Sequence, residues 1–174
     1  MIFFYILIIF IIGQRLIELI IAHRNEKWML ERGGIEIGNE HYKLFILLHL
    51  MFFIVLIYEV QFVLTSKSIL FNFYFFILFI LAQIGRVWCI VSLGKFWNTK
   101  IIVLPKVVLI KKGPYKYMKH PNYVIVFVEL FTIPAMFGAY MTAAIFPILH
   151  LLLLMIRIPA EEKALGRRVG QKIN

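Results

Sequence analysis

The segment from Gly113 to Tyr123 holds the residues best suited to chemistry. It opens with a Gly-Pro turn, and Pro121 suits the first turn of a helix, where its missing N–H costs nothing. We therefore expect His120 at the cap of a helix, with Asn122 in its first turn. Free N–H groups and the positive end of the helix dipole favour an anionic or polar ligand group at this position. The alternative is an interfacial anchor, because Tyr and Lys are common at the headgroup level of a membrane.

A second candidate lies where the last apolar block ends. If Arg157 and Glu161 share a helix, they are four residues apart and lie on one face. Pro159 disfavours the helical conformation at Ile158, which predicts a kink. An Arg and a Glu beside a kink could bind an anion and a polar ligand group, respectively. The alternative is a basic residue that stops translocation, followed by a solvated charged tail.

Charged residues also occur inside the apolar blocks. Glu129 has no partner nearby in the sequence, so we expect it to meet a basic group from another helix, with Arg86 as the candidate. Arg15 and Glu18 are three residues apart and could pair with each other. Charges within a membrane are expensive and usually face the bundle interior or a wet cavity. These residues could serve a site or hold the bundle together.

The elements that must position these residues are membrane-spanning helices. Of the 174 residues, 62% are hydrophobic and 16% are charged, which is typical of an integral membrane protein. The blocks Met1–Ala22, Leu44–Leu64 and Ile69–Leu93 are each long enough to cross a bilayer as a helix. Val124–Ile156 is too long for one span, and Gly138 divides it into two helices joined by a tight turn. The sequence therefore predicts an all-α protein with five spans and a C-terminal helical hairpin.

The distribution of basic residues predicts the orientation of these spans. The successive connections and the C-terminal tail contain 4, 1, 7, 0 and 5 Lys and Arg residues. Because cytoplasmic loops collect Lys and Arg, this alternation predicts an N-terminus outside and a C-terminus in the cytoplasm. The net charge of +10 then suits the anionic leaflet of a cell membrane rather than nucleic acid, since no separate soluble domain carries it.

Residues 1–174 are expected to form one membrane domain. Residues 1–93 would hold three N-terminal spans, and residues 94–174 would hold a cofactor-binding connection, the hairpin and a cytoplasmic tail. Within the connection, Ile101–Ile110 is apolar but too short to span, so we expect it to lie in the interface or over the helix ends. The first block lacks a basic n-region and an Ala-x-Ala-like cleavage site, so we expect a helix rather than a signal peptide.

Some site classes are disfavoured by the sequence. The single cysteine, Cys89, excludes an intramolecular disulfide and a Cys-based metal centre. The five histidines show no tight ligand spacing, so no metal site is expected. No Gly-x-Gly-x-x-Gly pattern of a dinucleotide-binding fold occurs, and no obligate protein partner is evident.

Taken together, these segments resemble the isoprenylcysteine carboxyl methyltransferase family of membrane enzymes. The resemblance depends on Gly113-Pro114-Tyr115, Lys119-His120-Pro121-Asn122-Tyr123, Glu129, Arg157 and Glu161-Glu162. Leu93–Lys100 is similar to the small bacterial branch of the family. The match covers about Leu93 to Arg168, and Lys119 stands where the family often has Arg. Lys keeps the charge but loses the planar fork of a guanidinium.

The resemblance implies that the hairpin, the connection before it and the tail enclose S-adenosylmethionine at the cytoplasmic face. The implied cofactor-binding residues are Val107, Val108, Leu109, Ile110, Tyr115, His120, Pro121, Asn122, Tyr123 and Glu161. Glu161 would hydrogen-bond the cofactor, and Arg157 would be the catalytic residue that faces the reacting group of the substrate.

The implied reaction is methyl transfer to a lipophilic carboxylate or enol. Such an acid is ionised near neutral pH, so alignment and the exclusion of water can supply most of the catalysis without a strong base. The family's eukaryotic branch methylates a prenylated cysteine, and members of the bacterial branch methylate long-chain alkylpyrones, which we take as the leading case. Two alternatives stay open. One is an NADPH-dependent sterol or lipid reductase with a similar His-Pro-x-Tyr element, and the other is a non-catalytic membrane adaptor.

Overall fold

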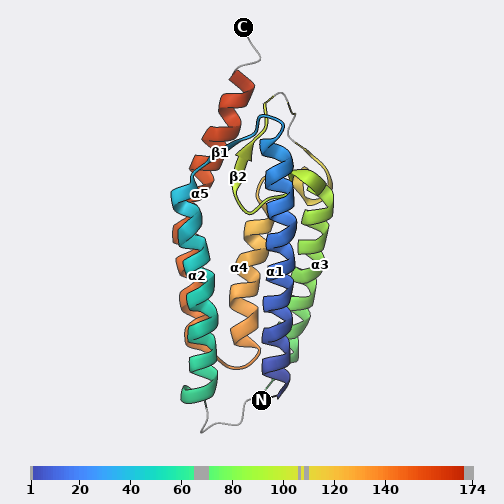
Figure 1. Ribbon diagram of the computed structural model, residues 1–174. Coiled ribbons are helices and arrows are strands. Elements are labelled where there is room, and N and C mark those ends of the chain that lie inside the picture. The colour runs from blue at the N-terminus through green and yellow to red at the C-terminus, as the bar shows by residue number, and fades with distance from the viewer. Residues whose placement is uncertain (1, 65–70, 106, 108–109, 171–174) are drawn as a thin grey trace.

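The protein is a bundle of long helices with a small sheet at one end. A computed structural model describes residues 2–64, 71–105, 107 and 110–170. The helices and strands are α1 (Ile2–Leu30), β1 (Ile35–Ile37), α2 (Asn39–Tyr58), α3 (Phe73–Leu93), β2 (Ile101–Val103), α4 (Pro121–Ala135) and α5 (Tyr140–Gly170). Three short helical segments, η1 (Glu59–Val63), η2 (Gly94–Phe96) and η3 (Gly113–Lys116), complete the set. The sheet and the C-terminal end of α5 lie at the end of the bundle opposite the N-terminus (Figure 1).

The described residues confirm an all-helical membrane architecture in its main features. Four helices are long and apolar enough to cross a membrane within this part of the chain, namely α1, α2 with η1, α3 and α5. The predicted fourth span corresponds to α4, which at 15 residues is shorter than a typical span. The count of five spans and the outside N-terminus therefore stay predictions.

Two helices extend beyond the predicted blocks. α1 continues past Ala22 to Leu30, so polar residues at its end remain helical. α5 continues past Ile156 to Gly170 and contains both Pro147 and Pro159. Pro159 therefore does not end the helix, and the residues that follow it belong to α5 rather than to a separate tail.

Part of the apolar segment Ile101–Ile110 forms a strand, and its buried residues pack over the end of α1, which is one of the two expected placements. β2 pairs antiparallel with β1, with Ile101 opposite Ile37 and Val103 opposite Ile35. Ile102 and Leu104 are buried and pack with Met29 near the end of α1. This small sheet therefore fixes the connection to the N-terminal half of the protein.

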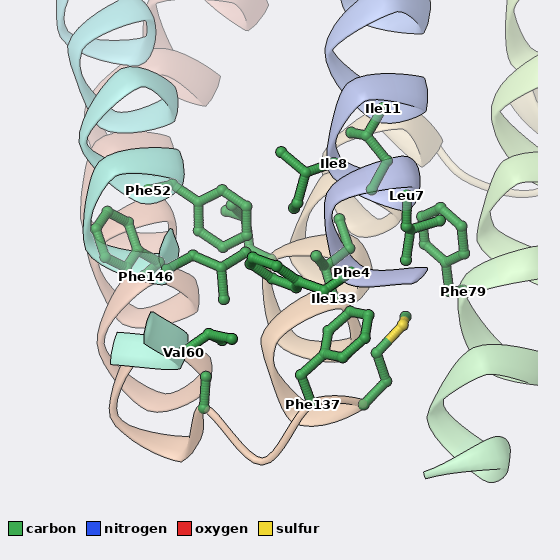
Figure 2. Packing of buried hydrophobic residues seen from close by; sticks show 14 of the residues in the cluster. Phe4, Leu7, Ile8, Ile11, Phe52, Val60, Phe79, Ile133, Phe137 and Phe146 are labelled. Carbon is green, nitrogen blue, oxygen red and sulfur yellow. The ribbon is translucent and has the colours of Figure 1, made fainter. Parts of the chain in front are cut away.

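An aromatic core fills the bundle near the N-terminal end of α1. Phe4 contacts Phe137 edge-to-face at 5.0 Å between ring centres, and Phe52 contacts Phe146 in the same manner at 5.4 Å. Figure 2 shows these rings converging from α1, α2, α5 and the turn between α4 and α5. Edge-to-face pairs of buried rings add about 0.5–1.5 kcal/mol each beyond their apolar burial.

The turn of the hairpin is closed by a carboxylate from another helix. Gly138 has a φ of +77°, which favours glycine, and lies between α4 and α5 as the sequence predicts. Glu59, buried at the end of α2, accepts hydrogen bonds from the backbone N–H groups of Met141 and Thr142 at 3.0 and 2.8 Å. A carboxylate at this position satisfies free donors at the start of α5 and complements its dipole.

The charges inside the helices form one network that joins α1, α3 and α4. Arg86 donates from Nε to Glu129 at 2.8 Å and also pairs with it through Nη2. Arg15 pairs with Glu129 and donates to Glu18 at 2.7 Å. The predicted Arg86–Glu129 and Arg15–Glu18 pairs are both confirmed, and the four charges sum to zero. A neutral, mutually bonded set is the form in which charges are tolerated in a bundle interior.

Candidate active site

A cavity of about 590 Å³ lies at the sheet end of the bundle. It is within the range of about 300–1,000 Å³ usual for small-molecule sites. Its walls come from the ends of α1 and α3, the connection from η2 to α4, the first turn of α4 and the last turns of α5. Apolar walls include Phe96, Ile101, Ile102, Val107 and Ile110, and polar walls include Lys100, Lys119, His120, Asn122, Glu161 and Glu162.

A glycine sets the path of the chain into the cavity. Gly113 has a φ of +57°, and a Cβ atom there would lie 2.0 Å from Ser92 Oγ on α3. Only glycine therefore fits between the connection and α3 at this point. The following turn, η3, places Tyr115 on the cavity wall, and burial raises the pKa of its hydroxyl above the usual range. Tyr115 is thus a neutral hydrogen-bonding group at physiological pH.

The start of α4 has the predicted geometry. His120 is the N-cap residue and Pro121 occupies the first helical position. The His120 ring stacks on the Tyr123 ring at 5.4 Å between centres. His120 Nε2 and Asn122 Oδ1 are buried and make no hydrogen bond within the described part of the chain, and Nε2 lies 3.6 Å from Glu162 Oε1. Buried polar atoms normally have partners, so these two indicate a ligand or ordered water in the cavity.

Tyr123 connects the cavity residue Glu161 with Arg157. Its hydroxyl donates to Glu161 Oε2 at 2.6 Å and accepts from Arg157 Nε at 3.1 Å. Glu161 lines the cavity, whereas Arg157 is 5% exposed and is not among the residues that line it. The predicted placement of Arg157 and Glu161 on one helical face is confirmed, because both contact the same hydroxyl.

The Arg157 guanidinium is held by contacts with Thr99 and Phe45, whereas its Nη1 makes no hydrogen bond within the described residues. Its Nη2 donates to the backbone carbonyl of Thr99 at 2.7 Å, and its guanidinium lies 5.3 Å from the centre of the Phe45 ring. Arg157 Nη1 is buried without a hydrogen-bond partner in the described part of the chain. The guanidinium is therefore oriented by the protein and keeps the N–H groups of Nη1 available for an anion.

The structure brings together most of the residues that the sequence predicts for the site. Val107, Ile110, Tyr115, His120, Asn122, Tyr123 and Glu161 line the cavity. Pro121 is buried in α4 and contributes to the shape of the helix start instead of the cavity wall. The predicted residues Val108 and Leu109 lie outside the described residues.

Asn98 and Lys100 are among the cavity residues that the sequence does not predict. The Asn98 side chain donates to the carbonyl of Ala22 on α1 at 3.1 Å and accepts from the backbone N–H of Lys100 at 2.9 Å. Lys100 pairs with Glu26 and Glu36 at 2.7 and 3.3 Å, and the hydrogen bond to Glu26 is the main cause that raises its pKa. The sequence does indicate that this region matters, because Leu93–Lys100 resembles the family, but the resemblance assigns no role to Asn98 or Lys100.

The fold and site define a multi-pass membrane protein with a cavity at one end of its helical bundle. The cavity has both apolar and polar walls and is bordered by the start of a short helix and the end of a long one. Residues 75–167 match the isoprenylcysteine carboxyl methyltransferase (ICMT) family. The chain belongs to this family, and membership assigns it to a class of membrane methyltransferases.

Two bacterial relatives extend the match beyond that region. The chain is 44% identical to the uncharacterized protein YpbQ of Bacillus subtilis (strain 168) over 164 residues, covering 93% of this chain and 96% of the relative. It is 28% identical to an uncharacterized protein of Haemophilus influenzae over 162 residues, covering 90% of this chain and 91% of the relative. These matches include the N-terminal half, which the family region does not cover.

Proposed function

We propose that the protein is an S-adenosylmethionine-dependent O-methyltransferase that acts on a lipophilic carboxylate or enol at the cytoplasmic face of the cell membrane. The observation that carries the proposal is the arrangement around Tyr123. Its side chain lines a cavity with polar atoms that make no hydrogen bond, and its hydroxyl bonds a buried guanidinium whose Nη1 is unpartnered among the described residues. A methyl donor and an anionic acceptor need two such neighbouring sites.

The cavity residues fit the chemical groups of this cofactor. Its amino acid end carries an ammonium and a carboxylate, and the cavity offers Glu161 and Glu162 together with Lys100 and Lys119. The adenosine end is flat and largely apolar with polar edges. The apolar walls and the unpartnered atoms of His120 and Asn122 are suited to such a group.

When bound, S-adenosylmethionine supplies an electrophilic methyl group on a positively charged sulfur. Arg157 would contact the substrate oxygen through Nη1 and favour its anionic form. Tyr123 would hold the side chains of Arg157 and Glu161 in fixed positions relative to each other through the two hydrogen bonds of its hydroxyl. Because the substrate oxygen is ionised before it reacts, the site needs no general base, and its main contributions are alignment and the exclusion of water.

The substrate is an amphiphile in this proposal. A prenylcysteine-like acid and a long-chain alkylpyrone-like enol both present an ionisable oxygen on a hydrophobic tail. Family membership supports a methyltransferase acting in the membrane, and the position of Arg157 on a membrane-spanning helix supports a substrate that enters from the lipid.

The test is calorimetric titration of the detergent-purified protein with S-adenosylhomocysteine. We expect micromolar binding by the wild type, loss of at least tenfold in affinity with Glu161→Ala, and a change below threefold with Arg157→Ala. Methyl transfer to a lipophilic acid, followed by mass spectrometry, should be lost in both variants. A folded protein that binds NADPH and ignores S-adenosylhomocysteine would refute the proposal in favour of a reductase.

A further inference from the structure

The peptide unit between Thr99 and Lys100 joins Arg157 to the N-terminal half of the protein. Its carbonyl accepts a hydrogen bond from Arg157 Nη2 at 2.7 Å. Its N–H donates to Asn98 Oδ1 at 2.9 Å. The Asn98 side chain then donates from Nδ2 to the carbonyl of Ala22 on α1 at 3.1 Å. A continuous line of hydrogen bonds therefore runs from the guanidinium on α5 to the backbone of α1.

The direction of the unpartnered Arg157 nitrogen depends on this line. Arg157 Nε donates to the Tyr123 hydroxyl at 3.1 Å, and Nη2 donates to the Thr99 carbonyl. Because a guanidinium is planar and rigid, fixing two of its nitrogens also fixes the third. That third nitrogen, Nη1, is buried and makes no hydrogen bond within the described residues. The Thr99 carbonyl thus determines where Nη1 points as much as the Tyr123 hydroxyl does.

Asn98 sets the orientation of the Thr99 carbonyl. A side-chain oxygen that accepts from the N–H two residues further on closes a local turn and holds the peptide unit between them. An asparagine amide can do this and still donate to α1, because it has one acceptor and two donors. Lys100 also pairs with Glu26 and Glu36, but these contacts act at the end of a flexible side chain and leave the peptide plane to Asn98.

Other bonds hold the neighbouring backbone without reaching this peptide unit. Asn25 on α1 donates from Nδ2 to the carbonyls of Trp97 and Gly94 at 2.7 and 3.2 Å. Thr99 adds a longer bond from its own Oγ1 to the Tyr42 hydroxyl at 3.3 Å. Asn25 is therefore a matched comparison, since it is the same residue type and joins the same segment to α1 by two bonds.

We propose that Asn98 is a positioning residue for methyl transfer, which orients the Thr99 carbonyl and through it the Arg157 guanidinium. The inference rests on the proposed function, in which Arg157 Nη1 contacts the acceptor oxygen. It gives the N-terminal half of the chain a part in the reaction, because the line of bonds ends on α1. Methyl transfer depends on alignment, so a misdirected guanidinium slows the reaction without weakening the binding of the cofactor.

The first measurement is the rotation of the Arg157 guanidinium about its Cζ–Nε bond. Nitrogen NMR of arginine-labelled, detergent-purified full-length protein records it without cofactor or substrate, and the Arg157 signal is the one absent from Arg157→Lys. Asn98→Leu is close in size but cannot hydrogen-bond, so it should speed this rotation about fivefold. Asn25→Leu should change it by less than about twofold, because its two lost bonds lie outside the line. Asn98→Asp keeps the turn and loses the bond to Ala22, so its rotation rate should fall between the two.

The second measurement is methyl transfer from S-adenosylmethionine to palmitate, with calorimetric titration of S-adenosylhomocysteine in parallel. Asn98→Leu should lower kcat about tenfold and change the affinity for S-adenosylhomocysteine by less than about threefold, although Asn98 borders the cavity. Asn25→Leu should keep kcat within about threefold of the wild type. A tenfold loss of affinity in Asn98→Leu, with unchanged rotation of Arg157, would assign Asn98 to cofactor binding and overturn the positioning role.

Equal effects of Asn98→Leu and Asn25→Leu on the rotation would mean general loosening of the segment and would also overturn it. If Asn98→Leu does not fold, Asn98→Asp decides, and a wild-type rotation rate in that variant counts against the proposal. Methyl transfer by the wild type, with rotation unchanged in the Asn98 variants, contradicts the positioning role alone. Faster rotation in Asn98→Leu, with no binding of S-adenosylhomocysteine by the wild type, contradicts the proposed function alone.

Discussion

Replacing Glu129 with glutamine should lower the melting temperature of the detergent-purified protein by about 10 °C. The Glu129 carboxylate accepts from Arg86 Nε at 2.8 Å and from Gln83 at 2.7 Å, and it also pairs with Arg15. Its loss leaves two arginines with one carboxylate, that of Glu18. Breaking a buried pair costs about 3–5 kcal/mol. In a chain of this size, each kcal/mol shifts the melting temperature by about 2–4 °C.

The matched control is Glu162→Gln, which removes an exposed carboxylate that pairs with Lys119 and should leave the melting temperature unchanged. A second variant combines Glu129→Gln with Arg15→Gln, which restores neutrality by removing the more exposed of the two arginines. It should recover about half of the loss. If Glu129→Gln melts like the wild type or like the Glu162 control, the network does not hold the helices together and the reasoning is refuted.

Three further predictions concern the hairpin and the cavity. Gly113→Ala should destabilise the protein by about 2 kcal/mol more than the control Gly33→Ala. Both glycines have a positive φ, but only at Gly113 would the new Cβ lie 2.0 Å from Ser92 Oγ. Equal melting temperatures of the two variants would contradict this prediction. Glu59→Gln should cost about 1–2 kcal/mol by weakening the bonds to the first N–H groups of α5, and amide hydrogen exchange should accelerate there and not in α3. Tyr123→Phe keeps the stacked ring but loses both hydrogen bonds of the hydroxyl. We therefore expect kcat for methyl transfer to fall at least tenfold, while the affinity for S-adenosylhomocysteine changes less than threefold. The reverse pattern would assign the hydroxyl to cofactor binding.

The start of α4, the turn before α5, and the helices α2 and α3 could be predicted from the residues of each segment alone. Pro121 begins α4 because its ring and missing N–H suit the first helical position, and Gly138 breaks the last apolar block because it adopts a positive φ. The apolar blocks predict α2 and α3 because the length of each block matches the thickness of a bilayer. These features need no information about partners elsewhere in the chain.

The continuity of α5 could not be predicted in this manner. Pro159 removes a backbone donor and disfavours helix at the preceding residue. In the structure, Arg157 and Glu161 on either side of it both bond the hydroxyl of Tyr123. Contacts with α4 therefore support the helix across the proline, and such contacts are invisible in a local pattern.

The part of the site near Lys100 depends on pairings between distant segments. β1 and β2 are three residues each, too short to be recognised alone, and they stabilise each other through long-range pairing. Asn98 has its partner on α1, and Lys100 has its partners on α1 and β1. Sequence resemblance indicated that this segment matters, but only the fold shows that it forms the wall of the cavity.

The short helix α4 explains how a cavity built largely from connecting segments can hold its groups in place. Asn122 and Tyr123 occupy its first turn, and Glu129 lies about two turns further on, roughly 9 Å along the axis from Tyr123. The first turn is bonded to α5 through Tyr123, and the Glu129 network bonds the same helix to α1 and α3. A helix fixed at two points on different neighbours cannot rotate or slide without breaking a buried polar contact. The charge network, although outside the cavity, therefore sets the position of the tyrosine that connects Glu161 with Arg157.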